Sequence, residues 1–468
     1  MPGSGRRAFA ACAAFAAAVW ALSAAPAASQ QREAPRRANA GSLTGHGGPI
    51  KAIRVDPATG RALTGSFDYA MMVWDVSGEE PKRLLRLDGH EGAVNAVAFV
   101  PGGTRALAAG NDGAVALWDL ATGRLVHRFI GHQAKVVGLA VSADGGLAAS
   151  AAWDRTVRIW DLMRLAAGPV LGDHKGPVNA VAFSADGTTV YTGSADGGIG
   201  AYNAADGTLL RSLYRHGWGI NVLERLPDGD RLLFGAHDGA VAVVDGRTGD
   251  GIRTLKSHDR PVLALAILEK PNLVATGGGD GTIRVMRAAD GAVIEEYQNA
   301  HGPVWALAFS GGTRMYYGGL DDFAALWHVV PRRPFETVEG QFPRRFQATS
   351  GARDDPLAAG EVQFARKCSV CHTLEPDGAN RAGPSLFGIF GRRIGSLPSY
   401  PYSDALKKLD IVWSEETVGK LFELGPDTFT PGSKMPLQKI LDAGQRAALI
   451  AYLKAVTTGN PTHKGERQ

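Results

Sequence analysis

The 468-residue sequence predicts two domains of different fold class: a seven-bladed β-propeller built from short antiparallel strands, followed by a small all-α domain. Three observations support this prediction. A histidine-led pattern recurs about every 42 residues through the first three quarters of the chain. The 61 glycines suit many short strands joined by tight turns. The last quarter loses the repeat and takes on helical patterning instead.

The N-terminal segment has the pattern of a secretory signal. Arg6 and Arg7 supply its charged region, an Ala-rich apolar stretch runs to about Leu22, and small residues follow at 25–28. The apolar run is short and ends in a cleavage zone, which distinguishes a signal peptide from a membrane span. We therefore expect residues 1–28 to be removed and the mature protein to be periplasmic. Retention as a membrane anchor is the alternative, and lipid attachment at Cys12 would leave almost no apolar region before it.

The repeat can be followed from its histidines, which lie 44, 42, 42, 42, 42 and 43 residues apart. Each is followed by an apolar stretch, a turn and a second apolar stretch, as expected for two hairpin-linked strands. An Asp follows each His after 22 residues, or after 20 in the last unit, and a large apolar residue usually comes six residues later. The histidines are His46, His90, His132, His174, His216, His258 and His301; the aspartates are Asp68, Asp112, Asp154, Asp196, Asp238, Asp280 and Asp321; the third positions hold Trp74, Trp118, Trp160, Tyr202, Val244, Met286 and Trp327.

In three units the third position is followed by Asp, as in Trp74-Asp75, Trp118-Asp119 and Trp160-Asp161. The pattern resembles the WD-repeat family, and seven units imply a seven-bladed propeller over about residues 40–330. The chain has no fourth strand for its last blade after Trp327. We expect the strand at 42–44 to complete that blade and close the ring, which protects the sheet edges.

The resemblance also gives the repeat residues a structural role. In WD repeats the His, a Ser or Thr, the Asp and the Trp form a hydrogen-bonded chain inside each blade, which fixes the strands when every member is satisfied. Later blades depart from the pattern and are expected to depend more on apolar packing. The first blade offers His46, Thr64, Asp68 and Trp74, and the third offers His132, Ser150, Asp154 and Trp160; the departures are Val244 and Met286 at Trp positions and Phe234 and Tyr317 at Ser/Thr positions.

Residues 331–355 are rich in Pro and Arg and predict a linker, and residues 459–468 predict a polar tail. Between them, residues 356–458 predict a helical domain. Helical patterns run from Ala359 to Lys367, from about Ser414 to Leu424 with Ser414 as N-cap, and over about 442–456.

Residues 368–372 form a C-x-x-C-H motif. Two thiols three positions apart can add to the two vinyl groups of one haem, and the adjacent histidine then lies under the iron as an axial ligand. A redox dithiol, half a zinc site or a surface disulfide would keep the cysteines but has no need for the histidine. The sequence therefore predicts one covalent haem c held by Cys368, Cys371 and His372.

The candidate for the second axial ligand is Met435, 63 residues after His372 on a loop shaped by Pro431 and Gly432. A lone methionine can also be a core residue. However, the loop sequence Pro-Gly-Ser-Lys-Met resembles that of class I cytochromes c, and the resemblance extends over the whole terminal domain. The matching positions are 383–386, 388, 390–392, 402–405, 413 and 449–454.

The resemblance implies roles for further residues. The carbonyl of Pro384 would accept a hydrogen bond from the His372 ring, which orients the ligand and raises its basicity. Arg392, Tyr402 and Trp413 would hold the buried haem propionates. At the crossing of the terminal helices, the packing pairs would be Gly360 and Phe364 with Leu449 and Tyr452.

This chain also departs from the family pattern. Leu406 replaces a usual polar residue near the propionates, and the position of a usual tyrosine falls on Leu421 or Phe422. A drier pocket is expected to shift the reduction potential. The positions around the haem edge where basic residues are common hold Lys367, Lys434 and Asp427.

His372 and Met435 together would fill both axial positions of the iron, which favours one-electron transfer over binding of oxygen, nitrite or peroxide. The remaining histidines, His127, His237, His328 and His463, show no metal-ligand spacing. We therefore expect an exported electron carrier rather than an enzyme with its own substrate, with the propeller or the haem edge docking a redox partner protein. The alternatives are a redox enzyme whose propeller binds a substrate or second cofactor, and a redox-sensing scaffold.

The formal charge of +4 falls to about +2 without Arg6 and Arg7, so nothing calls for a nucleic-acid partner. No later run of about eighteen apolar residues exists, so we expect no transmembrane span in the mature chain. We expect a monomer.

Overall fold

The computed structural model describes residues 41–329, apart from 252, 271, 300, 301, 312 and 313, together with most of 356–457. Within the latter range, residues 370, 375–382, 399, 401, 432, 434 and 436–438 are not described. The predicted signal segment, the linker, the polar tail, His301, Lys434 and His463 therefore lie outside the described residues. Among the described residues, none of the helices combines the length and the hydropathy of a membrane span.

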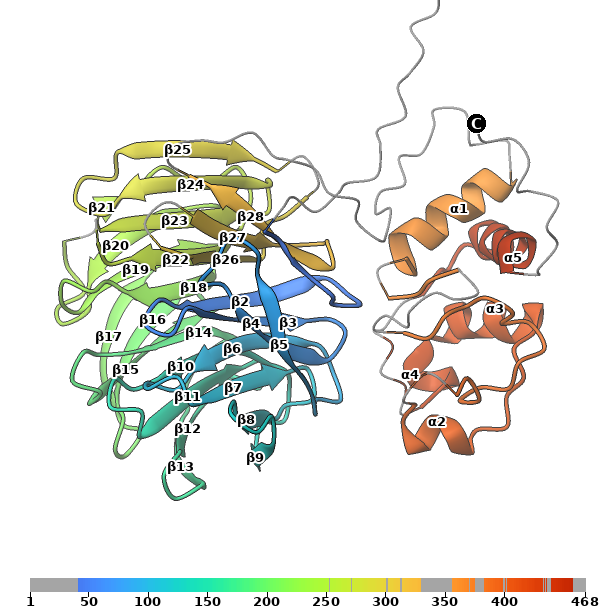
Figure 1. Cartoon of the computed structure of the whole chain (residues 1–468), viewed down its shortest axis with the longest axis horizontal. Coiled ribbons are helices and arrows are strands. Elements are labelled where there is room, and N and C mark those ends of the chain that lie inside the picture. Colours follow the sequence, from blue (N-terminus) through green and yellow to red (C-terminus); the bar gives the residue numbers. More distant parts are fainter. Residues whose placement is uncertain are drawn as a thin grey trace, which may run out of the picture. The chain divides into compact units, whose positions relative to one another are not determined.

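The described strands form seven four-stranded antiparallel sheets, as the repeat predicts (Figure 1). Each sheet keeps its strands in sequence order except the last, which β1 joins from the start of the chain. In blade order the strands are β2 (Ile50–Asp56), β3 (Arg61–Ser66), β4 (Ala70–Asp75), β5 (Lys82–Asp88); β6 (Val94–Phe99), β7 (Arg105–Gly110), β8 (Val115–Asp119), β9 (Leu125–Phe129); β10 (Val136–Val141), β11 (Leu147–Ala152), β12 (Val157–Asp161), β13 (Ala166–Leu171); β14 (Val178–Phe183), β15 (Thr189–Ser194), β16 (Gly198–Asn203), β17 (Leu209–Arg215); β18 (Ile220–Arg225), β19 (Arg231–Ala236), β20 (Val241–Asp245), β21 (Arg253–Thr254); β22 (Val262–Leu268), β23 (Leu273–Gly278), β24 (Thr282–Arg287), β25 (Val293–Gln298); and β26 (Ala306–Phe309), β27 (Arg314–Gly318), β28 (Phe323–His328) with β1 (Leu43–Thr44).

The first strands of successive blades contact one another, and β26 contacts β2, so the seven sheets close into a ring. Apolar side chains from neighbouring blades fill the space between the sheets. Leu63 and Met71 of the first blade, for example, share one buried cluster with Val94 and Trp118 of the second. Burial between blades is the main stabilising term of such a ring.

The strand predicted to close the ring does so. Leu43 of β1 pairs with Ala324 of β28, and Thr44 pairs with Phe323. Leu43 is fully buried. The N-terminal strand thus supplies the outer strand of a blade whose other three strands come from the end of the repeat array.

The predicted hydrogen-bonded chain is present in the first blade. His46 Nδ1 donates to the Asp68 carboxylate at 3.0 Å, and the Thr64 hydroxyl lies 2.7 Å from His46 Nε2. Trp74 Nε1 donates to the same hydroxyl at 2.8 Å. The third blade repeats this arrangement with His132, Ser150, Asp154 and Trp160 at 2.8 Å for each of the three contacts.

The second blade lacks the hydroxyl of this chain. Ala108 pairs with Val97 in the register that Thr64 has with Ile53. As a result, His90 Nε2 and Trp118 Nε1 are buried without a hydrogen-bond partner. Such buried groups lower the stability of the fold, because they give up hydrogen bonds to water and form none in return.

In five blades the innermost strand carries an alanine at one equivalent position. At the same position the first and fifth blades carry Arg54 and Glu224 instead, and these side chains form an ion pair. Because β2 and β18 belong to non-adjacent blades of the ring, the pair spans the central channel. The alanines are Ala98, Ala140, Ala182, Ala266 and Ala308.

The C-terminal helical domain contains α1 (Pro356–Lys367), α2 (Asp404–Lys408), α3 (Glu415–Leu424), α4 (Pro426–Phe429) and α5 (Ala443–Thr457). Ser414 caps α3 as predicted, because its side chain accepts from Thr417 N. Helices α1 and α5 cross at Gly360, where an added Cβ would come within 2.0 Å of the Ala448 carbonyl oxygen. The crossing is completed by Phe364 and Tyr452, whose ring centroids lie 5.8 Å apart.

Candidate haem site

The C-x-x-C-H motif continues the last turn of α1. Cys368 N donates to Phe364 O at 2.8 Å, Cys371 N donates to Cys368 O at 3.0 Å, and His372 N donates to Cys368 O at 2.9 Å. Helix-like i→i+3 and i→i+4 bonds place the three side chains on one side of the turn. Cys368 and Cys371 are not joined in a disulfide.

The His372 ring is fixed from two directions. His372 Nδ1 donates to the carbonyl oxygen of Pro384 at 2.8 Å, as the family resemblance predicts. This bond leaves Nε2 as the nitrogen that can bind a metal. Gly383 lies so close to the ring that an added Cβ would come within 2.3 Å of His372 Cε1. Any larger residue at position 383 would displace the imidazole.

All eight cofactor-binding residues predicted from the sequence line one cavity of the helical domain. They come from the α1 turn, from the loops before α2 and α3, and from the loop between α4 and α5. The wall is otherwise mainly apolar. The predicted residues are Cys368, Cys371, His372, Pro384, Arg392, Tyr402, Trp413 and Met435.

Arg392 is held by its backbone surroundings. Its guanidinium donates to Ser385 O at 2.7 Å through Nη2 and to Phe387 O at 3.1 Å through Nη1. Burial lowers the pKa of Arg392, while the nearby Tyr402 hydroxyl opposes this shift. The strand-like contact from Trp413 N to Arg392 O, at 3.0 Å, brings the indole to the same wall.

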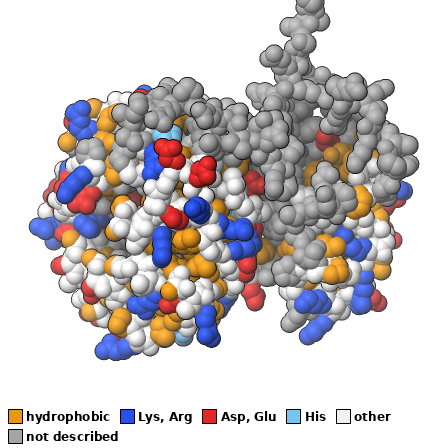
Figure 2. Space-filling view, in the orientation of Figure 1, with side chains coloured by type: hydrophobic (Ala, Val, Ile, Leu, Met, Phe, Trp, Pro, Cys, Tyr) orange, Lys and Arg blue, Asp and Glu red, His pale blue; other side chains and the backbone are white. Residues whose placement is uncertain are grey.

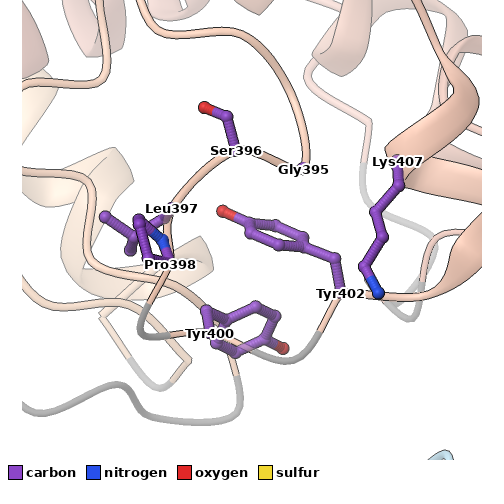
Figure 3. Close-up of a pocket in the computed structure, with 7 residues that line it drawn as sticks. All are labelled: Gly395, Ser396, Leu397, Pro398, Tyr400, Tyr402 and Lys407. Carbon is purple, nitrogen blue, oxygen red and sulfur yellow. The ribbon is translucent and has the colours of Figure 1, made fainter.

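Tyr400 and Tyr402 line both the main cavity and a second hollow, and Figure 3 shows the second hollow. Their rings meet edge to face, with centroids 4.8 Å apart. Burial raises the pKa of both hydroxyls, so both phenols stay protonated at neutral pH. In Figure 3 the Tyr402 ring lies between Leu397 and Pro398 on one side and Lys407 on the other.

The methionine loop is anchored at both ends. Thr430 Oγ1 and Thr430 N both donate to Pro426 O, which ties the start of the loop to α4. Met435 N then donates to Ser433 Oγ at 3.1 Å, and Ile440 N donates to Phe422 O at 2.8 Å where the chain returns. The loop thereby presents Met435 to the cavity that His372 lines.

The positions that depart from the family pattern make part of the wall apolar. Leu406, Leu421 and Phe422 all line the cavity, and each is less than one tenth exposed. Both candidates for the missing tyrosine position therefore reach the site, and neither brings a hydroxyl.

Sequence reasoning missed several lining residues. Tyr400, Thr430 and Ser433 belong to the cavity wall but lie in loops without periodicity. The only available signals were the spacing of Tyr400 from Tyr402 and the place of Ser433 within the methionine loop.

These residues fit a covalently attached haem. The cavity offers two thiols on one turn, an oriented imidazole, a thioether and a broad apolar wall, with Arg392 and Tyr402 as polar groups for the propionates. The close approach of Gly383 to the imidazole ring suits a ligand that must stand in one orientation. When bound, the haem supplies an iron that exchanges one electron.

The sequence matches the cytochrome c family at residues 357–457 and the WD domain, G-beta repeat family at 38–75, 81–119, 123–161, 169–203 and 249–286. The fifth and seventh blades, in which Phe234 and Tyr317 take the Ser/Thr position, lie largely outside these matches.

Similar proteins include cytochrome c of Gibberella zeae, 40% identical over 106 residues, which are 22% of this chain and 99% of that protein. Cytochrome c of Sesamum indicum is 40% identical over 101 residues, covering 22% of this chain and 90% of that protein. Cytochrome c of Chlamydomonas reinhardtii is 41% identical over 101 residues, covering 22% and 89% respectively.

A cytochrome c domain implies a covalent haem c, electron transfer and a redox partner. In this chain the cytochrome c domain follows a seven-bladed propeller of WD40 repeats. Because its C-terminal domain matches over nearly the full length of these relatives, the chain belongs to the cytochrome c family.

Proposed function

We propose that this protein is an exported electron carrier that moves one electron at a time through a haem with His372 and Met435 as axial ligands. The observation that supports this most directly is that His372 and Met435, 63 residues apart in sequence, line the same cavity. Imidazole and thioether ligands together close both axial positions, and the thioether favours the ferrous form.

The protein's own residues prepare this site in three ways. The Pro384 carbonyl oxygen holds the His372 ring by Nδ1, and Gly383 leaves room for the ring, because a Cβ there would come within 2.3 Å of His372 Cε1. The anchored loop carries Met435, and the apolar wall around Leu421 keeps water away from the site. Limited water access is one of the factors that set a haem reduction potential.

The propeller supports the proposal as a rigid platform. Its ring is closed by β1, and its His–Asp contacts pin the loops at one end. Loops held by such a scaffold are the usual place for partner recognition. We propose that the propeller docks the redox partner of the haem domain, and that the signal-like N-terminal segment directs the protein to the periplasm.

The proposal is tested with purified holoprotein from a host that matures c-type cytochromes. We expect one haem per chain, reversible one-electron reduction by ascorbate and reoxidation by ferricyanide, and recovery of the protein in the periplasmic fraction. Turnover of a small substrate by a second bound cofactor would overturn the carrier assignment. Retention of the protein in the cytoplasm would overturn the export assignment.

A further inference from the structure

One end of the propeller carries the His–Asp pairs, and we call it the His–Asp end. It is formed by the loops that precede the first strand of each blade and by the turns between the second and third strands. At this end Lys51 Nζ lies 5.2 Å from the ring centroid of Trp305. Phe67 stacks on the same indole, with centroids 5.8 Å apart and an interplanar angle of 25°. An ammonium over an aromatic face is stabilised by the ring's negative face.

A second lysine–tryptophan pair lies two blades further on. Lys135 Nζ is 3.3 Å from the ring centroid of Trp153, whose residue is 47% exposed. Burial lowers the pKa of Lys51 to about 8, and the charge of Lys135 adds to this shift. Burial also lowers the pKa of Lys135. Among the described residues, neither ammonium group forms an ion pair.

The blade between the two pairs contributes amides. Asn95 Nδ2 donates to Asn111 Oδ1 at 2.8 Å and to Val136 O of the next blade at 2.8 Å. The Asn111 side chain is exposed beside them. Together the four blades present a crescent made of Lys51, Phe67, Asn95, Asn111, Lys135, Trp153 and Trp305, which we call the lysine crescent.

The repeat network holds the crescent in place. Phe67 directly precedes Asp68, whose carboxylate accepts from His46, and Trp153 directly precedes Asp154, whose carboxylate accepts from His132. The aromatic side chains therefore project from turns that are fixed by buried hydrogen bonds. A preorganised surface loses little entropy when it binds a partner.

The charge of the crescent differs from that of its domain. Residues 41–330 contain more acidic than basic side chains. On the propeller face visible in Figure 2, basic and acidic side chains are interspersed. Two ammonium groups that have no acidic partner among the described residues, beside the exposed Trp153 and the half-buried Phe67 and Trp305, are therefore a local feature. Complementary charge would relieve their repulsion.

We propose that the lysine crescent binds an acidic extended segment of the protein that exchanges electrons with the haem domain. The surface spans four successive blades, so its occupant must be elongated. Carboxylates of that segment would pair with Lys51 and Lys135, and its backbone or apolar stems would lie on Trp153 and Trp305. This inference rests on the proposed docking role of the propeller and specifies the chemistry of the partner.

The test measures binding of short fluorescein-labelled peptides to full-length holoprotein by fluorescence anisotropy. One peptide alternates Glu and Gly, and the control peptide alternates Lys and Gly. We expect the acidic peptide to bind, the basic peptide not to bind, and added salt to weaken the complex. In the double variant Lys51→Gln/Lys135→Gln, affinity for the acidic peptide should fall by about tenfold or more.

The matched control is Lys82→Gln/Lys270→Gln, which removes the same charge from exposed positions at the opposite end of the propeller. This variant should bind the acidic peptide as the parent protein does. Equal binding by the crescent variant and the parent, equal losses in both variants, or equal binding of both peptides would overturn the inference. Circular dichroism confirms that each variant is folded.

Electron exchange with ascorbate and ferricyanide, measured on the same samples, separates this inference from the proposed carrier function. If electron exchange is normal but peptide binding does not depend on the lysine crescent, only the inference about the crescent is rejected. Failed exchange in the parent protein rejects the carrier function, whatever the peptides do.

Discussion

Arg54 of β2 and Glu224 of β18 form an ion pair across the central channel of the propeller, with 2.7 Å between Arg54 Nη2 and Glu224 Oε1. The two side chains are 44% and 34% exposed, so water screens the pair. The pair therefore links the first and fifth blades without the desolvation cost of a buried charge.

We expect this pair to contribute little to stability. In a double-mutant cycle with Arg54→Ala and Glu224→Ala, the coupling free energy should be about 1 kcal/mol or less. The double variant should unfold in urea close to the parent, because it extends the alanine lining of the other blades to all seven. A coupling of about 3 kcal/mol would show that the channel is far drier than the exposed fractions indicate.

The second blade should gain stability from the hydroxyl it lacks. In Ala108→Ser the new side chain can accept from Trp118 Nε1 and bond to His90 Nε2, both now unsatisfied. We expect the free energy of unfolding in urea to rise by about 1 kcal/mol. The converse variant is Thr64→Ala in the first blade. It should lower the free energy of unfolding by about 2 kcal/mol, because it leaves two buried groups without a hydrogen-bond partner. A destabilised Ala108→Ser variant would mean that the site has no room for the oxygen.

The contact between Gly383 and His372 predicts a specific defect. The Cβ of Gly383→Ala would come within 2.3 Å of His372 Cε1, so the ring must turn away from the Pro384 carbonyl. We expect less haem per purified chain and an altered Soret band. Gly419→Ala is the control, because its Cβ would meet only Ile450 Cδ1 at 3.6 Å and alanine favours the helix. A normal spectrum for Gly383→Ala would contradict this orientation of the ligand.

The proposed axial role of Met435 has an optical test. Met435→Ala should retain covalent haem at the cysteines but open the sixth position, so that added imidazole or cyanide binds and shifts the spectrum. Met163→Ala, which changes a methionine of the propeller that is 73% exposed, should leave the spectrum unchanged. If Met435→Ala shows the parent spectrum and binds no added ligand, Met435 is not the ligand.

The propeller should lose stability in mild acid. Burial lowers the pKa of His132 and His258 below the usual 6.5, although Asp154 and Asp280 oppose the shift. The unfolded chain therefore takes up protons at a higher pH than the folded chain does, and stability falls as the pH drops below about 6.5. We expect the melting temperature of the propeller to fall between about pH 7 and pH 5. The decline should be smaller in His132→Gln/His258→Gln, whatever the starting stability of that variant; an equal decline would assign the effect to other groups.

A second acid transition should follow at lower pH. Burial raises the pKa of Asp68, but hydrogen bonds and charge from His46 and Arg86 outweigh this effect and hold it well below its usual value of 3.8. Its contribution to stability is therefore present above about pH 4 and is lost as the pH falls further.

The sequence predicts the blades well because His, Asp and Trp recur at fixed offsets, and offsets survive even where one member is lost. For the same reason the repeat does not reveal that the second blade lacks a hydroxyl, because Ala108 takes the Ser/Thr position without changing the period. Arg54 and Glu224 lie 170 residues apart, and only the geometry of the closed ring shows that they meet.

The sequence likewise predicts only part of the haem site. A five-residue motif predicts its covalent part, and loop composition points to Met435. Tyr400 and Thr430, however, reach the cavity through loop conformations that carry no periodic signal.

The pairing of β1 with β28 also sets an order of events during synthesis. Leu43 and Thr44 leave the ribosome before any other described strand, but their partners Ala324 and Phe323 are made only at the end of the repeat array. The earliest strand must therefore wait, unpaired, for the latest. Once His328 has emerged, every strand of the ring exists, while Cys368 has yet to appear. The chain therefore contains all the partners for the propeller's last sheet before it contains the haem motif.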